Sequence, residues 1–213
     1  MIKRYLKQWL AVILSIFTII LPSFAAQPVQ YTDLEASAWY TGAIEELSKQ
    51  EIFQGVGNQC FNPKGSVTRA QLAVILYRLA GEPEADTSKI TVTDVPAEAW
   101  YAEAVSWWLS TPVGYYPEMG ELYLPDEPVT REQAAGYLYH YALSYLGLGA
   151  GQWADITAKD ADEISDNCLD FMKWVLGSGI MVGDPNGYLL PQKPVSRAEA
   201  AVMIYRLSLL IRM

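Results

Sequence analysis

One sequence pattern occurs three times in this 213-residue chain. Each occurrence opens on an apolar residue followed two places later by an aspartate, and these aspartates lie 61 residues apart: Asp33, Asp94 and Asp155. A glycine-containing loop, an apolar-x-Pro step and a Val-Thr-Arg or Val-Ser-Arg tripeptide follow in the same order each time. Because several independent elements recur in one order, we expect an array of similar structural units.

Each unit is expected to contain two helices. The second helix opens on a capping box, in which a hydroxyl accepts from the N3 amide and the N3 side chain returns to the N-cap amide. These boxes begin at Thr68, Thr130 and Ser196. In the first unit the earlier helix is expected from about Tyr40 to Gln50. A helix-loop-helix unit of this size cannot bury its apolar face alone, so the predicted fold is mainly α, with three units packed together.

The residues before the first unit have the order of a secretory signal peptide. Lys3, Arg4 and Lys7 form a positively charged start, an apolar run covers residues 9–21, and small residues follow. That order predicts cleavage after Ala25, so residues 1–25 are expected to be removed on export. The apolar run is shorter than the ~20 residues of a membrane-spanning helix, and no later segment reaches that length. The three units are named the first, second and third copy, with expected boundaries at residues 29–82, 90–147 and 151–210.

Charge and composition argue against several function classes. The formal net charge is −9 at pH 7, so no general attraction for nucleic acid or anionic lipid is expected. Two cysteines and one histidine are fewer than the four ligands that a structural zinc site usually has, and neither a metal nor a cofactor is predicted. The sequence has no histidine-centred triad, phosphate loop or nucleophile elbow, so the chain is predicted not to be an enzyme. Counting acids leaves a catalytic carboxylate pair open.

The repeated pattern resembles the S-layer homology (SLH) repeat. The resemblance rests on the opening aspartate, the Trp39-Tyr40 and Trp100-Tyr101 pairs, the glycine loop, and the Thr-Arg-Ala-Gln or similar signature of the second helix. It extends over about residues 29–210. It implies three SLH repeats folded as a pseudo-threefold bundle, with grooves between repeats that bind secondary cell-wall polysaccharide, often pyruvylated. In some lineages such repeats attach to peptidoglycan instead.

The resemblance also implies which residues line the grooves. They are the signature arginine, the opening aspartate and the tryptophan of each copy where present: Arg69, Arg131, Arg197, Asp33, Asp94, Asp155, Trp39 and Trp100. An arginine in a first helical turn lies where free N–H groups already favour an anion, and its planar guanidinium can bind a carboxylate through two hydrogen bonds. A tryptophan face can support a sugar ring. The structural alternatives are an internal salt bridge for the arginines, packing for the tryptophans, and turn stabilisation for the aspartates.

The third copy departs from the pattern. Asn167 and Cys168 stand where the other copies have Trp-Tyr, after an acidic insertion of about six residues at 159–166. Its groove is therefore expected to be degenerate, and the first copy is expected to be the most competent for binding. Cys60 and Cys168 belong to copies that are neighbours in a threefold bundle, so they form either one disulfide or two thiols.

The predicted function is non-covalent anchoring to the bacterial cell wall, with wall polysaccharide or peptidoglycan as the partner. The expected location is secreted, at the cell wall or cell surface, with no membrane span after signal cleavage. The alternative is an envelope structural or protein-binding module without carbohydrate affinity, whose partner is another envelope protein. The acidic charge and the missing tryptophan of the third copy favour that alternative.

Overall fold

The computed structural model describes residues 30–111, 120–145, 147 and 153–211, so the predicted signal peptide lies outside the described residues. The α-helices of the described part are α1 (Thr41–Lys49), α2 (Arg69–Leu79), α3 (Ala102–Ser110), α4 (Arg131–His140), α5 (Leu169–Gly177) and α6 (Arg197–Ile211). Single helical turns η1 (Thr87–Lys89), η4 (Ala161–Glu163) and η5 (Asp166–Cys168) precede α3 and α5, and a π-helical turn, η3 (Tyr141–Tyr145), extends α4. Within these residues only isolated β-bridges occur and no β-strand. The mainly α prediction is confirmed.

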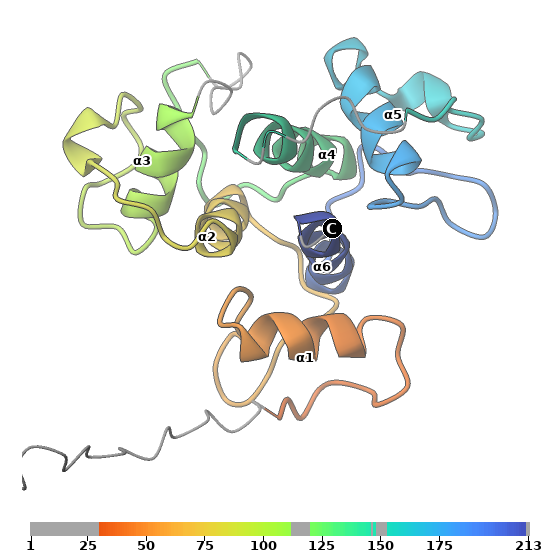
Figure 1. Cartoon of the computed structure of the whole chain (residues 1–213), viewed down its shortest axis with the longest axis horizontal. Coiled ribbons are helices and arrows are strands. Elements are labelled where there is room, and N and C mark those ends of the chain that lie inside the picture. Colours follow the sequence, from red (N-terminus) through yellow and green to blue (C-terminus); the bar gives the residue numbers. More distant parts are fainter. Residues whose placement is uncertain (1–29, 112–119, 146, 148–152, 212–213) are drawn as a thin grey trace, which may run out of the picture.

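The helices form an inner and an outer set. Figure 1 shows α2, α4 and α6 grouped at the centre, with α1, α3 and α5 outside them. The outer helix α1 packs against α6, α3 packs against α2, and α5 packs against α4. Each outer helix of the second and third copies therefore lies on the inner helix of the copy before it, and the outer helix of the first copy lies on the last helix of the chain.

The inner helices begin where the capping boxes predict. The Thr68 and Thr130 hydroxyls accept from the amides of Gln71 and Gln133, each at 3.3 Å, and both glutamine side chains accept from the N-cap amide in return. At the start of α6 the Ser196 hydroxyl accepts from the Glu199 amide at 3.2 Å. The outer helices α1, α3 and α5 begin without a side-chain cap. Their stability therefore depends on packing against the inner helices.

A closed ring of backbone hydrogen bonds joins the three copies. The Val67 N–H donates to the Val195 carbonyl (3.1 Å), the Val195 N–H to the Val129 carbonyl (2.8 Å), and the Val129 N–H to the Val67 carbonyl (2.9 Å). All three valines are fully buried. A buried backbone donor without a partner is costly, so each copy needs its neighbour to satisfy this amide.

The same neighbours satisfy the first turns of the inner helices, whose amides have no partner within the helix. The Arg69 N–H donates to the Glu127 carbonyl (3.0 Å), the Arg131 N–H to Lys193 (3.0 Å), and the Arg197 N–H to Gly65 (2.7 Å). The order is again cyclic: first copy to second, second to third, third to first. This cyclic order supports the pseudo-threefold bundle, which stays a prediction.

An aspartate braces the apolar-x-Pro step of each copy. Asp33 accepts from the amides of Phe61 (2.8 Å) and Asn62 (2.7 Å), and Asp94 accepts from those of Tyr123 and Leu124, both at 2.7 Å. In the third copy this role belongs to Asp160, which is buried and accepts from the amides of the apolar-x-Pro step Leu189-Leu190 (2.9 and 2.7 Å).

The prediction that Asp155 is the opening aspartate of the third copy is wrong. Asp155 is exposed, and the backbone contact that precedes each bracing aspartate, from Thr32 to Gln59 and from Thr93 to Glu121, is made in the third copy by Lys159 to Gly187. The extra residues therefore lie before the bracing aspartate rather than after it. A constant spacing of 61 residues hid the insertion.

The two cysteines are not joined by a disulfide. Cys60 lies in the turn that leads to Phe61, where its Sγ donates to the Asn58 carbonyl at 3.5 Å. Cys168 is buried at the N-terminus of α5, and α5 packs against α4. Cys60 thus lies in the first copy and Cys168 in the third, and the disulfide considered from the sequence is absent.

We predict that Asp160→Ala lowers the free energy of unfolding by at least about 2 kcal/mol, because it leaves two amides without their acceptor. Asp155→Ala, at an exposed position, is expected to change it by less than about 0.5 kcal/mol. Urea unfolding followed by tryptophan fluorescence measures both. Equal effects from the two substitutions would contradict the revised assignment of the third copy.

Acid is expected to destabilise the fold in a defined window. Burial raises the pKa of Asp33 and of Asp160, but the hydrogen bonds from the braced amides outweigh it, and both carboxyls have pKa values below their ordinary value of 3.8. A folded pKa below the unfolded one gives stability that is present above pH 3.8 and is lost as the pH falls through the folded pKa. The unfolding free energy should fall below about pH 4, and less steeply in Asp160→Ala; an equal pH slope in the variant would contradict this assignment.

Candidate functional site

Two grooves of nearly equal size lie where residues of all three copies meet. Groove A, with a volume of about 350 Å³, lies between the 180–190 loop and α6 and is completed by Trp39 and Arg131. Groove B, about 360 Å³, lies between the 53–56 loop and α2 and is completed by Trp100 and Arg197. Each groove thus combines the loop and inner helix of one copy with an arginine from the copy before it and a tryptophan from the copy after it, in cyclic order.

The two grooves are equivalent residue by residue. The inner helix contributes four positions spaced to lie on one face: Glu199, Val202, Met203 and Arg206 in groove A, and Gln71, Val74, Ile75 and Arg78 in groove B. The glycine loops contribute Gly183 and Gly55 at the same place, and in both a Cβ would meet a backbone carbonyl at under 3.0 Å. Glycine is required there because the two sides of the loop approach closely.

Arg131 and Arg197 form the inner wall of the grooves and are buried, at 6% and 4% exposure. Arg131 donates through Nε to the Leu189 carbonyl (2.6 Å) and through Nη2 to that of Val182 (2.9 Å). Arg197 donates in the same way to the carbonyls of Phe61 and Gln54, both at 2.7 Å. Each guanidinium therefore holds the glycine loop of the next copy in place, so these two predicted ligand residues also have a structural role.

Aromatic rings enclose the Arg197 guanidinium. Its carbon lies 4.6 Å from the ring centres of both Phe53 and Phe61. Burial lowers the pKa of Arg197 to about 10, with Tyr31 and Asp33 opposing the shift, so the side chain is still a cation at neutral pH. Arg69 is half-buried and donates through Nη1 to the Tyr123 carbonyl (3.2 Å).

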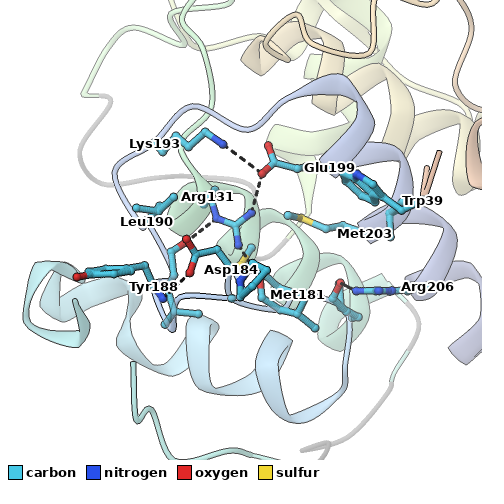
Figure 2. A pocket seen from close by; sticks show the side chains of 16 residues that line it. Trp39, Arg131, Met181, Asp184, Tyr188, Leu190, Lys193, Glu199, Met203 and Arg206 are labelled. Atoms are coloured by element: carbon cyan, nitrogen blue, oxygen red, sulfur yellow. Dashed lines mark hydrogen bonds and ion pairs between the residues drawn. The ribbon is translucent and has the colours of Figure 1, made fainter. Parts of the chain in front are cut away.

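Trp39 and Trp100 are the most exposed large apolar side chains of the grooves, at 66% and 68%. Each ring lies edge-on to the tyrosine that follows it, with ring centres 5.3 Å from Tyr40 and 5.2 Å from Tyr101. An indole fixed on one edge and open on its faces can support a flat ligand such as a sugar ring. Figure 2 shows Trp39 on the α6 side of groove A, beyond Met203.

The three aspartates predicted from the sequence do not line either groove. Asp33 and Asp94 brace backbone amides, as described above, and Asp155 is exposed outside both grooves. The contacts of Asp33 and Asp94 agree with the turn-stabilising alternative that the sequence left open.

Sequence reasoning missed Arg78 and Arg206. Both occur near the C-terminal ends of inner helices, where a cation is favoured by the helix dipole, and that local explanation obscured their equivalence. They line groove B and groove A. The signal was present, since Tyr-Arg recurs at the same place in two copies and Tyr139-His140 replaces it in the third. Burial lowers the pKa of His140, so this position of α4 is neutral at pH 7.

The missing tryptophan of the third copy does not affect the groove formed by that copy's own loop and inner helix. Its loop forms groove A, and the tryptophan there is supplied by the first copy. Asn167, two residues before α5 as Trp39 is two residues before α1, takes the place of that tryptophan in the cyclic order, and α5 packs against α4. Residues 112–119 of the second copy lie outside the described residues.

The described residues contain no group of His, Cys, Asp or Glu that could hold a metal ion. None of the described helices combines the length and apolar character needed to cross a membrane.

A family comparison matches two segments of the chain. Residues 30–73 and 159–201 match the S-layer homology domain. The second match begins next to Asp160, in agreement with the aspartate that the structure identifies. The chain therefore carries S-layer homology domains at these two segments, and the family predicted from the sequence is confirmed.

The relatives include surface proteins and enzymes. A cellulosome-anchoring protein of Acetivibrio thermocellus is 28% identical over 159 residues, which is 73% of this chain and 35% of that protein. The surface-layer 125 kDa protein of Lysinibacillus sphaericus is 26% identical over 185 residues, 85% of this chain and 15% of that protein. An amylopullulanase of Thermoanaerobacterium thermosulfurigenes is 28% identical over 172 residues, 79% of this chain and 9% of the enzyme. The chain thus spans well under half the length of these relatives.

Substituting a buried wall arginine and substituting the arginine at the end of an inner helix are expected to affect stability differently. Arg197→Ala removes hydrogen bonds to two carbonyls and should lower the unfolding free energy by about 2–4 kcal/mol. Arg78→Ala removes a side chain that is 31% exposed and whose ion pair with Glu82 is long, at 3.8 Å, so it should cost less than about 1 kcal/mol. Thermal unfolding of both variants checks this, and a larger loss in Arg78→Ala would contradict the structural role of Arg197.

Proposed function

We propose that this chain anchors itself non-covalently to the bacterial cell wall by binding wall polysaccharide in grooves A and B. The observation that carries the proposal is the recurrence of one constellation: an open tryptophan face, a buried arginine in the wall, and a second arginine at the end of the inner helix. Two equivalent grooves assembled from different parts of the chain are hard to explain by packing alone.

The chemistry of the grooves suits a saccharide. Sugar rings present apolar C–H faces to an indole and hydroxyl groups to arginine and backbone donors. A pyruvylated sugar also carries a carboxylate, which a guanidinium binds strongly. Secondary cell-wall polysaccharide of this kind is therefore the ligand class that we propose, with peptidoglycan as the other wall polymer to be tested.

The names of the relatives support an anchoring role. One relative is named for anchoring cellulosomes and another for the surface layer, and the location predicted from the sequence, at the cell surface, agrees with these names. The amylopullulanase shares this region over only a small part of its length, so its enzymatic name is attributable to the remainder of that protein. We propose that the segment described here is non-catalytic.

One observation favours the alternative of a protein-binding envelope module. Val182 (57% exposed) and Leu190 (37%) line groove A together with Trp39, and exposed apolar side chains of this kind can also bind a protein. Under this alternative the chain binds envelope protein and has no affinity for wall glycan.

Co-sedimentation with purified sacculi tests the proposal. Trp39→Ala combined with Trp100→Ala should weaken binding about tenfold or more, because each groove loses its aromatic platform. Trp153→Ala, at an exposed tryptophan outside both grooves, is the matched control and should bind normally.

Sacculi treated with acid to remove wall polysaccharide and ketal groups distinguish the ligands. Binding that survives this treatment while still depending on the groove tryptophans would point to peptidoglycan. Binding that ignores both the treatment and the tryptophans would overturn the carbohydrate-binding proposal and support the protein-binding alternative.

A further inference from the structure

Grooves A and B differ in charge at several equivalent positions: Asp184 in groove A corresponds to Val56 in groove B, and a further difference lies on the inner helix. The third residue of the inner helix is Glu199 in groove A and Gln71 in groove B. Both residues complete a capping box: Glu199 accepts from the Ser196 amide (2.8 Å), and Gln71 accepts from the Thr68 amide (3.3 Å). The position is therefore structurally the same in the two grooves, and only the charge of the side chain changes.

In groove A the protein supplies its own carboxylate to the wall arginine. Glu199 Oε1 lies 3.2 Å from Arg131 Nη1 and 3.4 Å from Lys193 Nζ, so one carboxylate serves two cations. Figure 2 shows this bridge, with Asp184 on the other side of the guanidinium. A second carboxylate bound to Arg131 would lie close to Glu199 and Asp184, which line the same groove, and like charges at short range repel.

In groove B the corresponding carboxylate is missing. Arg197 donates through Nε and Nη2 to main-chain carbonyls, and the neutral Gln71 stands where Glu199 pairs with Arg131. Among the described residues that line groove B, the charged ones are Arg78 and Arg197, and none is acidic.

A buried cation without a paired anion is unfavourable, which predisposes this groove to accept one from outside. Lysine is also absent from this part of the groove, because Gly65 occupies the position that Lys193 has relative to the ring valine. Groove B therefore presents two guanidinium groups to a ligand; Glu82 pairs with Arg78 at 3.8 Å and Asp33 attracts Arg197, but neither acid lines the groove.

We infer that the residue pair Gln71 and Glu199 sets the ligand specificity of the two grooves: groove B takes a carboxylate-bearing sugar, and groove A takes an uncharged sugar. The inference rests on the proposed saccharide binding and adds a division of labour to it. Gln71 also offers amide N–H donors to a ligand, where an ionised Glu199 offers only acceptor oxygens.

The indole N–H resonances of Trp39 and Trp100 report on the two grooves separately in an NMR titration. The probes are methyl glucuronide, which carries a carboxylate, and methyl glucoside, which is neutral. We expect the glucuronide to shift the Trp100 resonance at about tenfold lower concentration than the glucoside, since charged hydrogen bonds to guanidinium are the stronger ones. Trp39 should show the reverse preference, and Trp153 should not move.

Exchanging the two side chains should exchange the preferences. Gln71→Glu should abolish the preference of Trp100 for the glucuronide, and Glu199→Gln should give Trp39 that preference. Both substitutions keep the shape of the side chain and an oxygen for the capping box, so the fold is expected to be retained; the unfolding midpoint verifies this. If one variant is destabilised, the other still tests the inference.

Three outcomes would overturn the inference: no preference at Trp100, a glucuronide preference at Trp39 in the unsubstituted chain, or a preference that survives Gln71→Glu. Absence of any shift at Trp100 with the glucuronide counts against it as well. Retention on sacculi is measured in parallel. Sacculus binding without a charge preference at Trp100 would remove the inference and leave the proposed function intact, whereas loss of both would remove the proposed function.

Discussion

The closed ring of hydrogen bonds through Val67, Val129 and Val195 is the interaction on which the rest of the structure depends. Each N–H in the ring is satisfied by a different copy, so no copy can complete its own inner helix start. The arginine that follows two residues later is thereby placed against the loop of its neighbour, where it reaches the carbonyls that shape a groove. The backbone ring, the buried guanidinium and the binding surface are thus consecutive consequences of one short segment in each copy.

Local features of the fold were predictable because they depend on nearby residues. The capping boxes at Thr68, Thr130 and Ser196 mark the starts of the inner helices, and the mainly α class follows from the repeated pattern. The partner of each outer helix was not predictable in this way. Sequence order suggests that α1 pairs with α2, but the ring places α1 on α6, and only long-range packing decides between these arrangements.

The candidate site shows the same division. Trp39, Trp100, Arg131 and Arg197 were identified from the motif, and the structure places them in pairs across two grooves. Asp155 was the wrong residue because its spacing of 61 residues from Asp94 repeats that of the first two copies and concealed an insertion before Asp160. Arg78 and Arg206 were overlooked because a helix C-terminus already explains a cation, while the residues that make the same arginine part of a groove are distant in sequence.

Because grooves A and B each take parts from all three copies, neither groove is complete until α6 is in place. Groove B needs Arg197, and groove A needs both Trp39 and α6. The segments that precede α6 therefore hold only incomplete halves of both grooves. For the same reason, a proteolytic cut that released one copy would disrupt both grooves at once, so any function of the grooves depends on the integrity of all three copies.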